Sequence, residues 1–204
     1  MSKSTLSLWL RNRPLSDSQV EQLRQRVAAG GAQRGAILRA RAASRRAVVQ
    51  ESARQEITDL SDGELFVAGV VAYWAEGAKN KPWRTGEQVK FVNSDPDLIR
   101  LFLAWLDLVG VPGDQLVFRI QIHESSDANA AARFWREELG LAASQFGNPV
   151  MKRHRVKPAR YNTGDLYHGC LAVYVRRSAS LNVQIAGWWE GLLAELARPR
   201  RNEG

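Results

Sequence analysis

Hydrophobic and polar residues alternate most regularly in 115–124, where Leu116, Phe118, Ile120 and Ile122 are separated by Val117, Arg119, Gln121 and His123. A period of two predicts a half-buried β-strand with one apolar face and one mostly polar face. The polar face carries Arg119, Gln121 and His123, whose side chains suit contact with a nucleic-acid groove. Further strands are predicted at 88–93, which includes Lys90, and at 167–176.

A serine followed three residues later by Gln or Glu, between flanking apolar residues, marks a helix start twice. The two pairs are Ser16 with Gln19 and Ser61 with Glu64. We expect the first helix to end at Gly30–Gly31, because glycine is a common helix stop. The second start predicts a helix running to Glu76 and places the beginning of the main domain near Leu60.

The remaining helices are read from the 3.6-residue period and from their caps. Residues 33–57 are rich in Ala and Arg around a thin apolar stripe. They predict a long basic connector helix, which either lies along phosphates or is a solvated linker. Further helices are expected at 95–109, 127–139 and 178–196, with a basic loop at 148–165. This order of elements predicts an α+β fold preceded by an all-α N-terminal region.

Composition and charge narrow the range of partners. The chain has 204 residues, of which 45% are hydrophobic and seven are Trp, so it can bury a substantial core. It carries 29 Lys+Arg against 21 Asp+Glu, a formal net charge of +8. The basic residues concentrate in 1–56, with 11 basic and 4 acidic residues, and in 151–177, with 7 and 1. Two basic segments around an acidic middle predict a polyanionic partner.

The single cysteine, Cys170, excludes an internal disulfide and a zinc site built on paired cysteines. No run of 18 apolar residues occurs, and Met1–Ser4 leads into an amphipathic segment without the apolar core of a signal peptide. We therefore expect a cytoplasmic protein with no membrane partner.

The first eleven residues divide into two helical faces. Leu6, Trp9 and Leu10 share the apolar face. The DNA-binding candidates on the polar face are Lys3, Ser4, Thr5 and Ser7, and Arg11, which follows Leu10, is a further candidate. This segment resembles the second half of a bacterial helix-turn-helix, whose small hydroxyl side chains approach phosphates and base edges. A short amphipathic helix without a DNA role is the alternative. In either case its apolar face needs a partner, and Val20, Leu23 and Val27 form a matching stripe.

Residues 65–77 form a hydrophobic segment with a face of small residues, and the segment ends at Glu76–Gly77. Ala68, Ala72 and Ala75 lie at helical spacing, which would let a second helix pack closely. Ala75-Glu76-Gly77, with the run Asn93-Ser94-Asp95 that opens the next helix, resembles the LAGLIDADG homing-endonuclease domain. A core helix with an exposed terminal Glu-Gly is the alternative interpretation.

The resemblance covers about residues 60–196 and implies mixed helices with an antiparallel sheet. In an endonuclease of this family, Glu76 would be a catalytic residue and a ligand of Mg²⁺. A homodimer through the Ala68-Ala72-Ala75 face would supply the second Glu76. The domain division that follows is 1–30, a partial helix-turn-helix; 31–59, a basic connector helix; 60–196, the LAGLIDADG-like α+β domain; and 197–204, a disordered basic tail.

The densest basic run lies within the predicted loop, with Tyr161 available for base stacking. A flexible solvated loop is the alternative. The phosphate-binding candidates in this run are Lys152, Arg153, Arg155, Lys157 and Arg160.

The combination of a helix-turn-helix fragment with a LAGLIDADG-like domain resembles a family of bacterial sporulation regulators that bind DNA without cutting it. The sequence therefore favours a regulatory protein that binds double-stranded DNA and requires no cofactor. One alternative is a Mg²⁺-dependent homodimeric endonuclease, and another is an RNA-binding or protein-interaction module.

Overall fold

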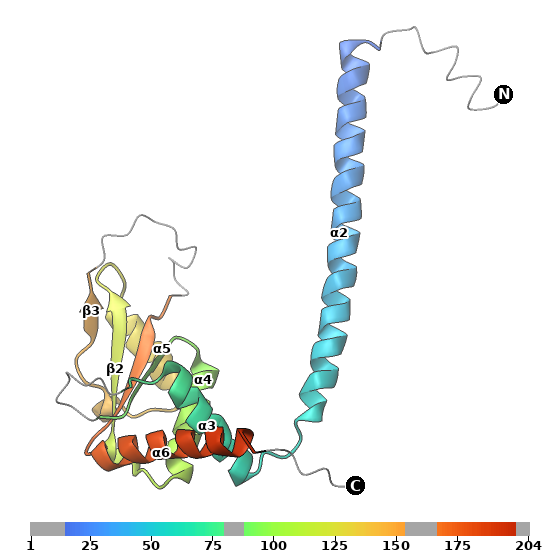
Figure 1. Cartoon of the computed structure of the whole chain (residues 1–204). Coiled ribbons are helices and arrows are strands. Elements are labelled where there is room, and N and C mark those ends of the chain that lie inside the picture. The colour runs from blue at the N-terminus through green and yellow to red at the C-terminus, as the bar shows by residue number, and fades with distance from the viewer. Residues whose placement is uncertain (1–14, 80–87, 154–166, 199–204) are drawn as a thin grey trace, which may run out of the picture. The chain divides into compact units, whose positions relative to one another are not determined.

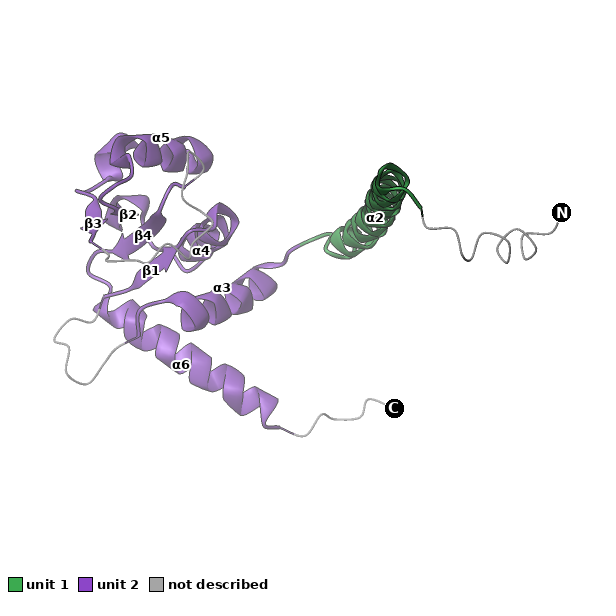
Figure 2. Ribbon diagram, turned by 90° about the horizontal axis from the view of Figure 1, so that it is seen from above, with its two compact units in different colours: residues 1–59 green, residues 60–204 purple. Residues whose placement is uncertain are grey.

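The computed structural model describes residues 15–79, 88–153 and 167–198 (Figure 1). The chain divides into two compact units, Met1–Asp59 and Leu60–Gly204 (Figure 2). The predicted α+β class is confirmed: an N-terminal helical region precedes a unit with helices and one four-stranded sheet. Among the described residues, no helix is both long and apolar enough to cross a lipid bilayer.

The first unit contains the 40-residue helix α2, Asp17–Glu56. Its start is the predicted capping box, in which the Ser16 hydroxyl accepts from the Gln19 backbone and the Gln19 side chain accepts from the Ser16 backbone. The predicted stop at Gly30–Gly31 is wrong, because α2 continues through both glycines. Glycine retains its N–H and C=O groups, and the Ala and Arg residues around it favour the helix.

The second unit begins with α3, whose cap is the predicted box between Ser61 and Glu64. Asp95 and Asp127 cap the next two long helices by accepting backbone N–H groups. The elements in chain order are α3 Asp62–Glu76, β1 Lys90–Asn93, α4 Pro96–Leu108, β2 Leu116–His123, α5 Ala128–Leu139, β3 Val150–Lys152, β4 Cys170–Val175 and α6 Ala179–Leu196.

The sheet has the strand order β1-β4-β2-β3. Strand β4 pairs antiparallel with both β1 and β2, whereas β3 pairs parallel with β2. The sheet is therefore mixed and not wholly antiparallel. Strand β3 lies in the region predicted to be a loop. Its three residues are all exposed, so no alternation of buried and exposed positions marks it in the sequence.

One face of the sheet forms the core of the unit. Phe118, Ile120 and Ile122 are buried on β2. They share this face with Leu171, Val173 and Val175 of β4, because the two strands pair in register. Helix α4 packs on the same face through Phe102, whose ring stacks on that of Phe91 with centroids 4.3 Å apart. Trp135 of α5 is fully buried in the same cluster.

Gly69 of α3 lies against the indole ring of Trp105 in α4, and a methyl group at Gly69 would overlap that ring. The close helix contact at Gly69 is therefore made within the chain, by α4. Of the small residues on α3, Ala68 and Ala72 are half-buried and Ala75 is exposed.

A buried polar link joins α3 to α6. The Tyr73 hydroxyl donates to the carbonyl of Ala78 at 2.9 Å and accepts from the Asn182 amide at 3.1 Å. Burial raises the pKa of Tyr73, so this hydroxyl keeps its proton across the ordinary pH range. The link fixes the C-terminal end of α3, where Glu76 lies.

We predict that Gly69→Ala destabilises the second unit by about 1–3 kcal/mol, because the added methyl group forces α3 away from a fully buried Trp. Urea denaturation followed by tryptophan fluorescence measures the change. Gly63→Ala is the matched control in the same helix, since nothing lies within 4 Å of a methyl group there. Equal midpoints for the two variants would show that α3 and α4 do not pack closely at Gly69.

Candidate nucleic-acid interface

The second face of the sheet carries polar and basic side chains. Side chains alternate along a strand, so the residues of β2 that do not enter the core point to this face. They are Val117, Arg119, Gln121 and His123, of which Arg119 is exposed and the other three are half-buried; the last three are polar. Cross-strand register adds Lys90 of β1, Tyr174 of β4 and Lys152 of β3 to the same face. We call the six residues other than Val117 the basic sheet face.

Arg119 is held in place by two neighbours. Its guanidinium carbon lies 5.5 Å from the centroid of the Tyr174 ring, a cation–π distance. On its other side, a methyl group at Gly147 would come within 3.2 Å of Arg119 Nε. The Arg119 side chain therefore lies between the Gly147 backbone and an aromatic ring, which reduces the rotamer freedom lost when it binds a ligand.

Tyr174 also carries a second cation. Lys90 Nζ lies 5.1 Å from the ring centroid, and Lys90 pairs directly with Tyr174 across β1 and β4. The tyrosine thus places two positive charges side by side on the basic sheet face. Two fixed cations next to a half-exposed aromatic ring are suited to phosphate groups and to base stacking.

Gln121 and His123 continue the face along β2. His123 Nδ1 lies 3.3 Å from the backbone nitrogen of Ser125, which can only donate, and 2.8 Å from the Ser125 hydroxyl. Nδ1 therefore accepts, and Nε2 carries the proton of the neutral ring and can donate to a ligand. Gln121 offers both a donor and an acceptor, as adenine recognition requires.

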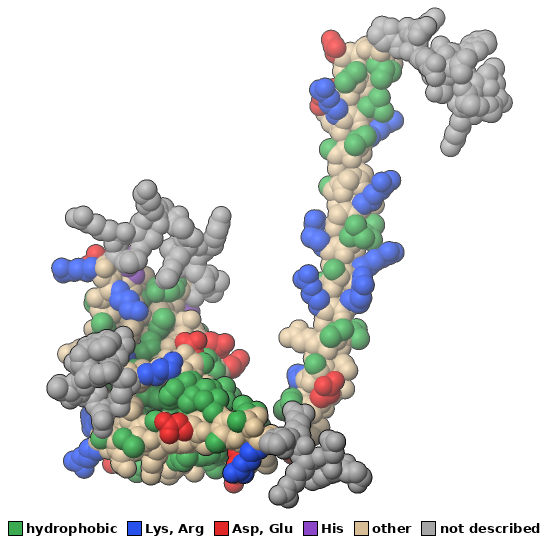
Figure 3. All heavy atoms as spheres, in the orientation of Figure 1, with side chains coloured by type: hydrophobic (Ala, Val, Ile, Leu, Met, Phe, Trp, Pro, Cys, Tyr) green, Lys and Arg blue, Asp and Glu red, His purple; other side chains and the backbone are tan. Residues whose placement is uncertain are grey.

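Lys152 extends the basic sheet face to its edge strand. It lies beside His123, its partner in the parallel β2–β3 pairing. The adjacent Arg153 is differently placed, since its Nε forms an ion pair of 3.3 Å with Glu124. Both side chains of that pair are largely exposed, so the ion pair exchanges readily with solvent or with a phosphate. Figure 3 shows Lys and Arg side chains over the region of β2 and β3.

The structure thus places four of the predicted strand candidates, Lys90, Arg119, Gln121 and His123, on one surface with Lys152. The predicted DNA-binding residues that lie outside the described residues are Lys3, Ser4, Thr5, Ser7, Arg11, Arg155, Lys157 and Arg160.

Two contributors to this surface were not predicted from the sequence. Tyr174 stands between Val173 and Val175 in the sequence, and this alternation could have placed it on the face opposite the core. Its two cation partners depend on strand pairing and could not be read from the sequence. Gly147 gave no signal, because its contact with Arg119 depends on the path of the chain after α5.

Glu76, the predicted catalytic residue, is exposed at the last position of α3. Within the described residues, no group of three His, Cys, Asp or Glu side chains lies close enough to hold a metal ion.

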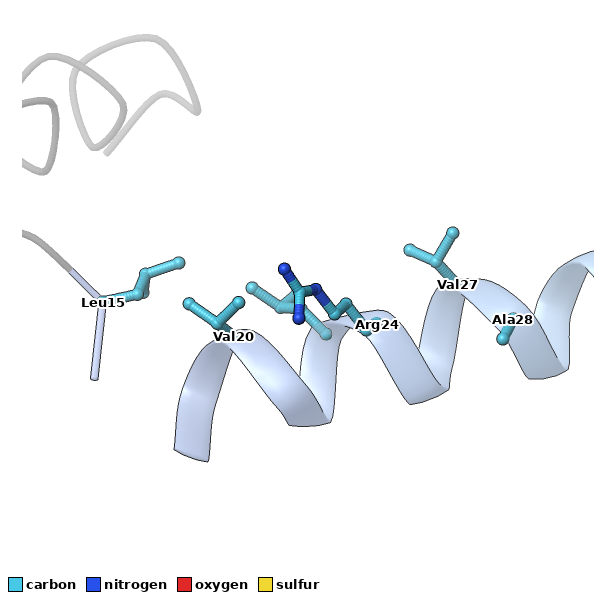
Figure 4. Close-up of a pocket in the computed structure, with 6 residues that line it drawn as sticks. Leu15, Val20, Arg24, Val27 and Ala28 are labelled. Atoms are coloured by element: carbon cyan, nitrogen blue, oxygen red, sulfur yellow. The ribbon is translucent and has the colours of Figure 1, made fainter. Parts of the chain in front are cut away.

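The first turns of α2 carry an open apolar groove (Figure 4). Val20, Leu23 and Val27 line it, as does Leu15, which precedes the helix. Val20, Leu23 and Val27 are the residues expected to receive the apolar face of Leu6, Trp9 and Leu10, which lie outside the described residues.

No protein-family model, curated protein or solved structure matches this chain. The basic sheet face therefore has to be interpreted from its own chemistry.

We predict that Tyr174→Leu lowers the free energy of unfolding by about 1 kcal/mol, whereas Tyr174→Phe leaves it nearly unchanged, because a phenyl ring retains the quadrupole that attracts Lys90 and Arg119. Urea denaturation measures both variants. In NMR spectra, the Arg119 Nε–H signal should shift toward its solvated position in Tyr174→Leu alone. Equal losses of stability in the two variants would mean that the Tyr174 hydroxyl, and not the face of its ring, provides the stabilisation.

Proposed function

We propose that this protein binds double-stranded DNA through the basic sheet face, as a non-cleaving regulatory protein. The single observation that carries the proposal is that one sheet face collects Lys90 and Arg119 beside Tyr174, and His123 and Lys152 farther along the same face. No Asp or Glu lies among the described strand residues of that face. A surface of one sign attracts a polyanion and is not neutralised by its own acids.

The residues of the face divide by the contacts they suit. Lys90, Arg119 and Lys152 bear full positive charges and fit phosphate oxygens, which give affinity without sequence preference. Gln121 and His123 lie between them on β2 and have the donor and acceptor pattern needed at base edges. A strand pair can enter the major groove of B-form DNA, so this order along the sheet is compatible with base reading between phosphate contacts.

The resemblance of Ala75-Glu76-Gly77 to the LAGLIDADG motif supports the same proposal, because it implies a domain that holds DNA against a sheet. The endonuclease form requires a second copy of the chain, which would bring another Glu76 carboxylate to the scissile phosphate. Cleavage by two metal ions needs several carboxylates around the scissile phosphate.

We predict that Arg119→Gln combined with Lys152→Gln weakens binding to duplex DNA and reduces the slope of log K against log salt by about 1.8, since each lost phosphate contact contributes about 0.9. Fluorescence anisotropy at several salt concentrations measures both quantities. The matched control is Arg133→Gln with Arg136→Gln, which removes two charges from the exposed surface of α5. If the control reduces the slope as much as the test pair, overall charge and not the sheet face drives binding.

We predict that the wild-type protein does not cleave DNA when Mg²⁺ is added. Supercoiled plasmid incubated with Mg²⁺, or with EDTA, provides the assay, and Glu76→Gln is the variant to compare. Cleavage by the wild type that disappears in Glu76→Gln, while DNA affinity is kept, would replace the regulatory proposal with the endonuclease alternative. Tighter binding to structured RNA than to duplex DNA at equal salt would favour an RNA-binding module.

A further inference from the structure

Helix α2 is a long helix that the described residues of the first unit leave exposed. None of its 40 residues, all of them described, is buried. Exposed aliphatic side chains lie along it, among them Leu38 and Val49, which are 65% and 66% exposed. A helix draws most of its stability from packing, and one that is exposed all round needs a partner.

The charge of α2 indicates the chemistry of that partner. Residues 22–50 contain seven Arg and no Asp, Glu or Lys. The acids of the helix lie outside this stretch, at Asp17, Glu21, Glu51 and Glu56. Figure 3 shows Lys and Arg side chains on both sides of the helix. A continuous stretch of one sign is complementary to a polyanion.

The arginines fall into two rows. At 100° per residue, Arg34, Arg41 and Arg45 share one line along the helix, and Arg39 and Arg46 share another about 130° away. The strip between the rows carries no charge and consists of Gly35, Leu38, Ala42 and Val49. We call this part of α2 the two-row segment.

We infer that the two-row segment lies in the major groove of B-form DNA, with each arginine row on one of the two phosphate backbones. A helix is about 10–12 Å across with its side chains, and the major groove is about 12 Å wide. Arg34 to Arg46 span about 20 Å, which corresponds to roughly six base pairs. The apolar strip then faces the base edges, where Leu38 and Val49 can contact thymine methyl groups.

Other partners fit the two-row segment less well. The major groove of an A-form RNA helix is deep and narrow and does not admit an α-helix. A second copy of α2 would bring two acid-free stretches of arginine together, which is unfavourable without a polyanion between them. Duplex DNA is therefore the occupant to which the charges and dimensions point.

Three glycines near the start of the two-row segment determine how much free energy is needed to order α2 on binding. Gly30, Gly31 and Gly35 lie inside the helix, and each lowers helix stability relative to alanine. Part of the free energy of DNA binding would therefore be used to hold α2 fully helical. A methyl group at Gly30 or Gly31 meets nothing within 4 Å, so alanine at both positions favours the helix without a clash.

This inference rests on the proposed DNA binding, but it concerns a separate surface, so the two can be tested apart. The full chain is titrated with a fluorescent 20-base-pair DNA duplex at several salt concentrations. The variants are Arg34→Gln with Arg41→Gln for one row, and Arg39→Gln with Arg46→Gln for the other. Arg119→Gln with Lys152→Gln tests the basic sheet face, and Arg133→Gln with Arg136→Gln is the control of equal charge.

Each row variant should reduce the salt slope by about 1.8 and weaken binding tens of fold at 0.1 M salt, while the α5 control changes neither. Gly30→Ala with Gly31→Ala should tighten binding several-fold, because less order has to be imposed on α2. Gly187→Ala with Gly191→Ala in α6 is the control, since both positions are also free of neighbours within 4 Å. That control should leave affinity unchanged.

The outcomes separate the two ideas. If both row variants keep the wild-type salt slope while the sheet variant loses DNA affinity, the role of α2 would be overturned and the proposed function would stand. Losses in the row variants alone would overturn the basic sheet face as the binding surface. Equal affinity for a 20-base-pair RNA duplex would overturn the groove assignment. Row variants that change the sedimentation coefficient without changing affinity would show that α2 pairs with a second copy.

Discussion

The register of β4 between β1 and β2 is the constraint on which the second unit depends. Phe118 pairs with Val173, and Val173 pairs with Phe91, so three strands present apolar residues to one side at the same level. A shift of one residue would turn Leu171 and Val173 toward solvent and direct Tyr174 into the core. The same pairing that builds the core therefore assembles the basic sheet face on the other side.

The helices keep that face rigid from behind. Helix α4 packs on the sheet through stacked rings of Phe91 and Phe102, and α3 approaches α4 closely because Gly69 leaves room for Trp105. The Ser178 hydroxyl adds a polar connection, since it donates to the carbonyl of Val175 and accepts from the backbone of Val89. A sheet held in this way can present charges at fixed spacing, which lowers the entropic cost of binding.

The two proposed DNA-contact surfaces differ in how they are organised. Arg119 of the basic sheet face is already restrained by Tyr174 and Gly147 before any ligand arrives. The arginines of α2 lie on an exposed helix that contains glycines, so a bound polyanion would stabilise their arrangement. A rigid surface suits the reading of base edges, whereas a helix ordered by binding suits phosphate contacts whose strength depends on salt.

The sequence by itself determined the local elements. The capping boxes at Ser16 and Ser61, the Asp95 cap and the alternation along β2 are short-range patterns, and each formed where it was expected. The prediction from sequence misplaced the end of the first helix, because glycine ends a helix only where the neighbouring residues do not favour its continuation.

Only the tertiary structure decided which side chains meet. Strand β3 forms because β2 offers it a free edge, and Tyr174 reaches Lys90 and Arg119 because β4 lies between their strands. Likewise, the small residues of α3 would allow close packing against any helix, and only the fold shows that Gly69 packs against Trp105 of α4. Contacts between residues distant in sequence depend on pairing and packing, which a local pattern of hydrophobic and polar residues does not encode.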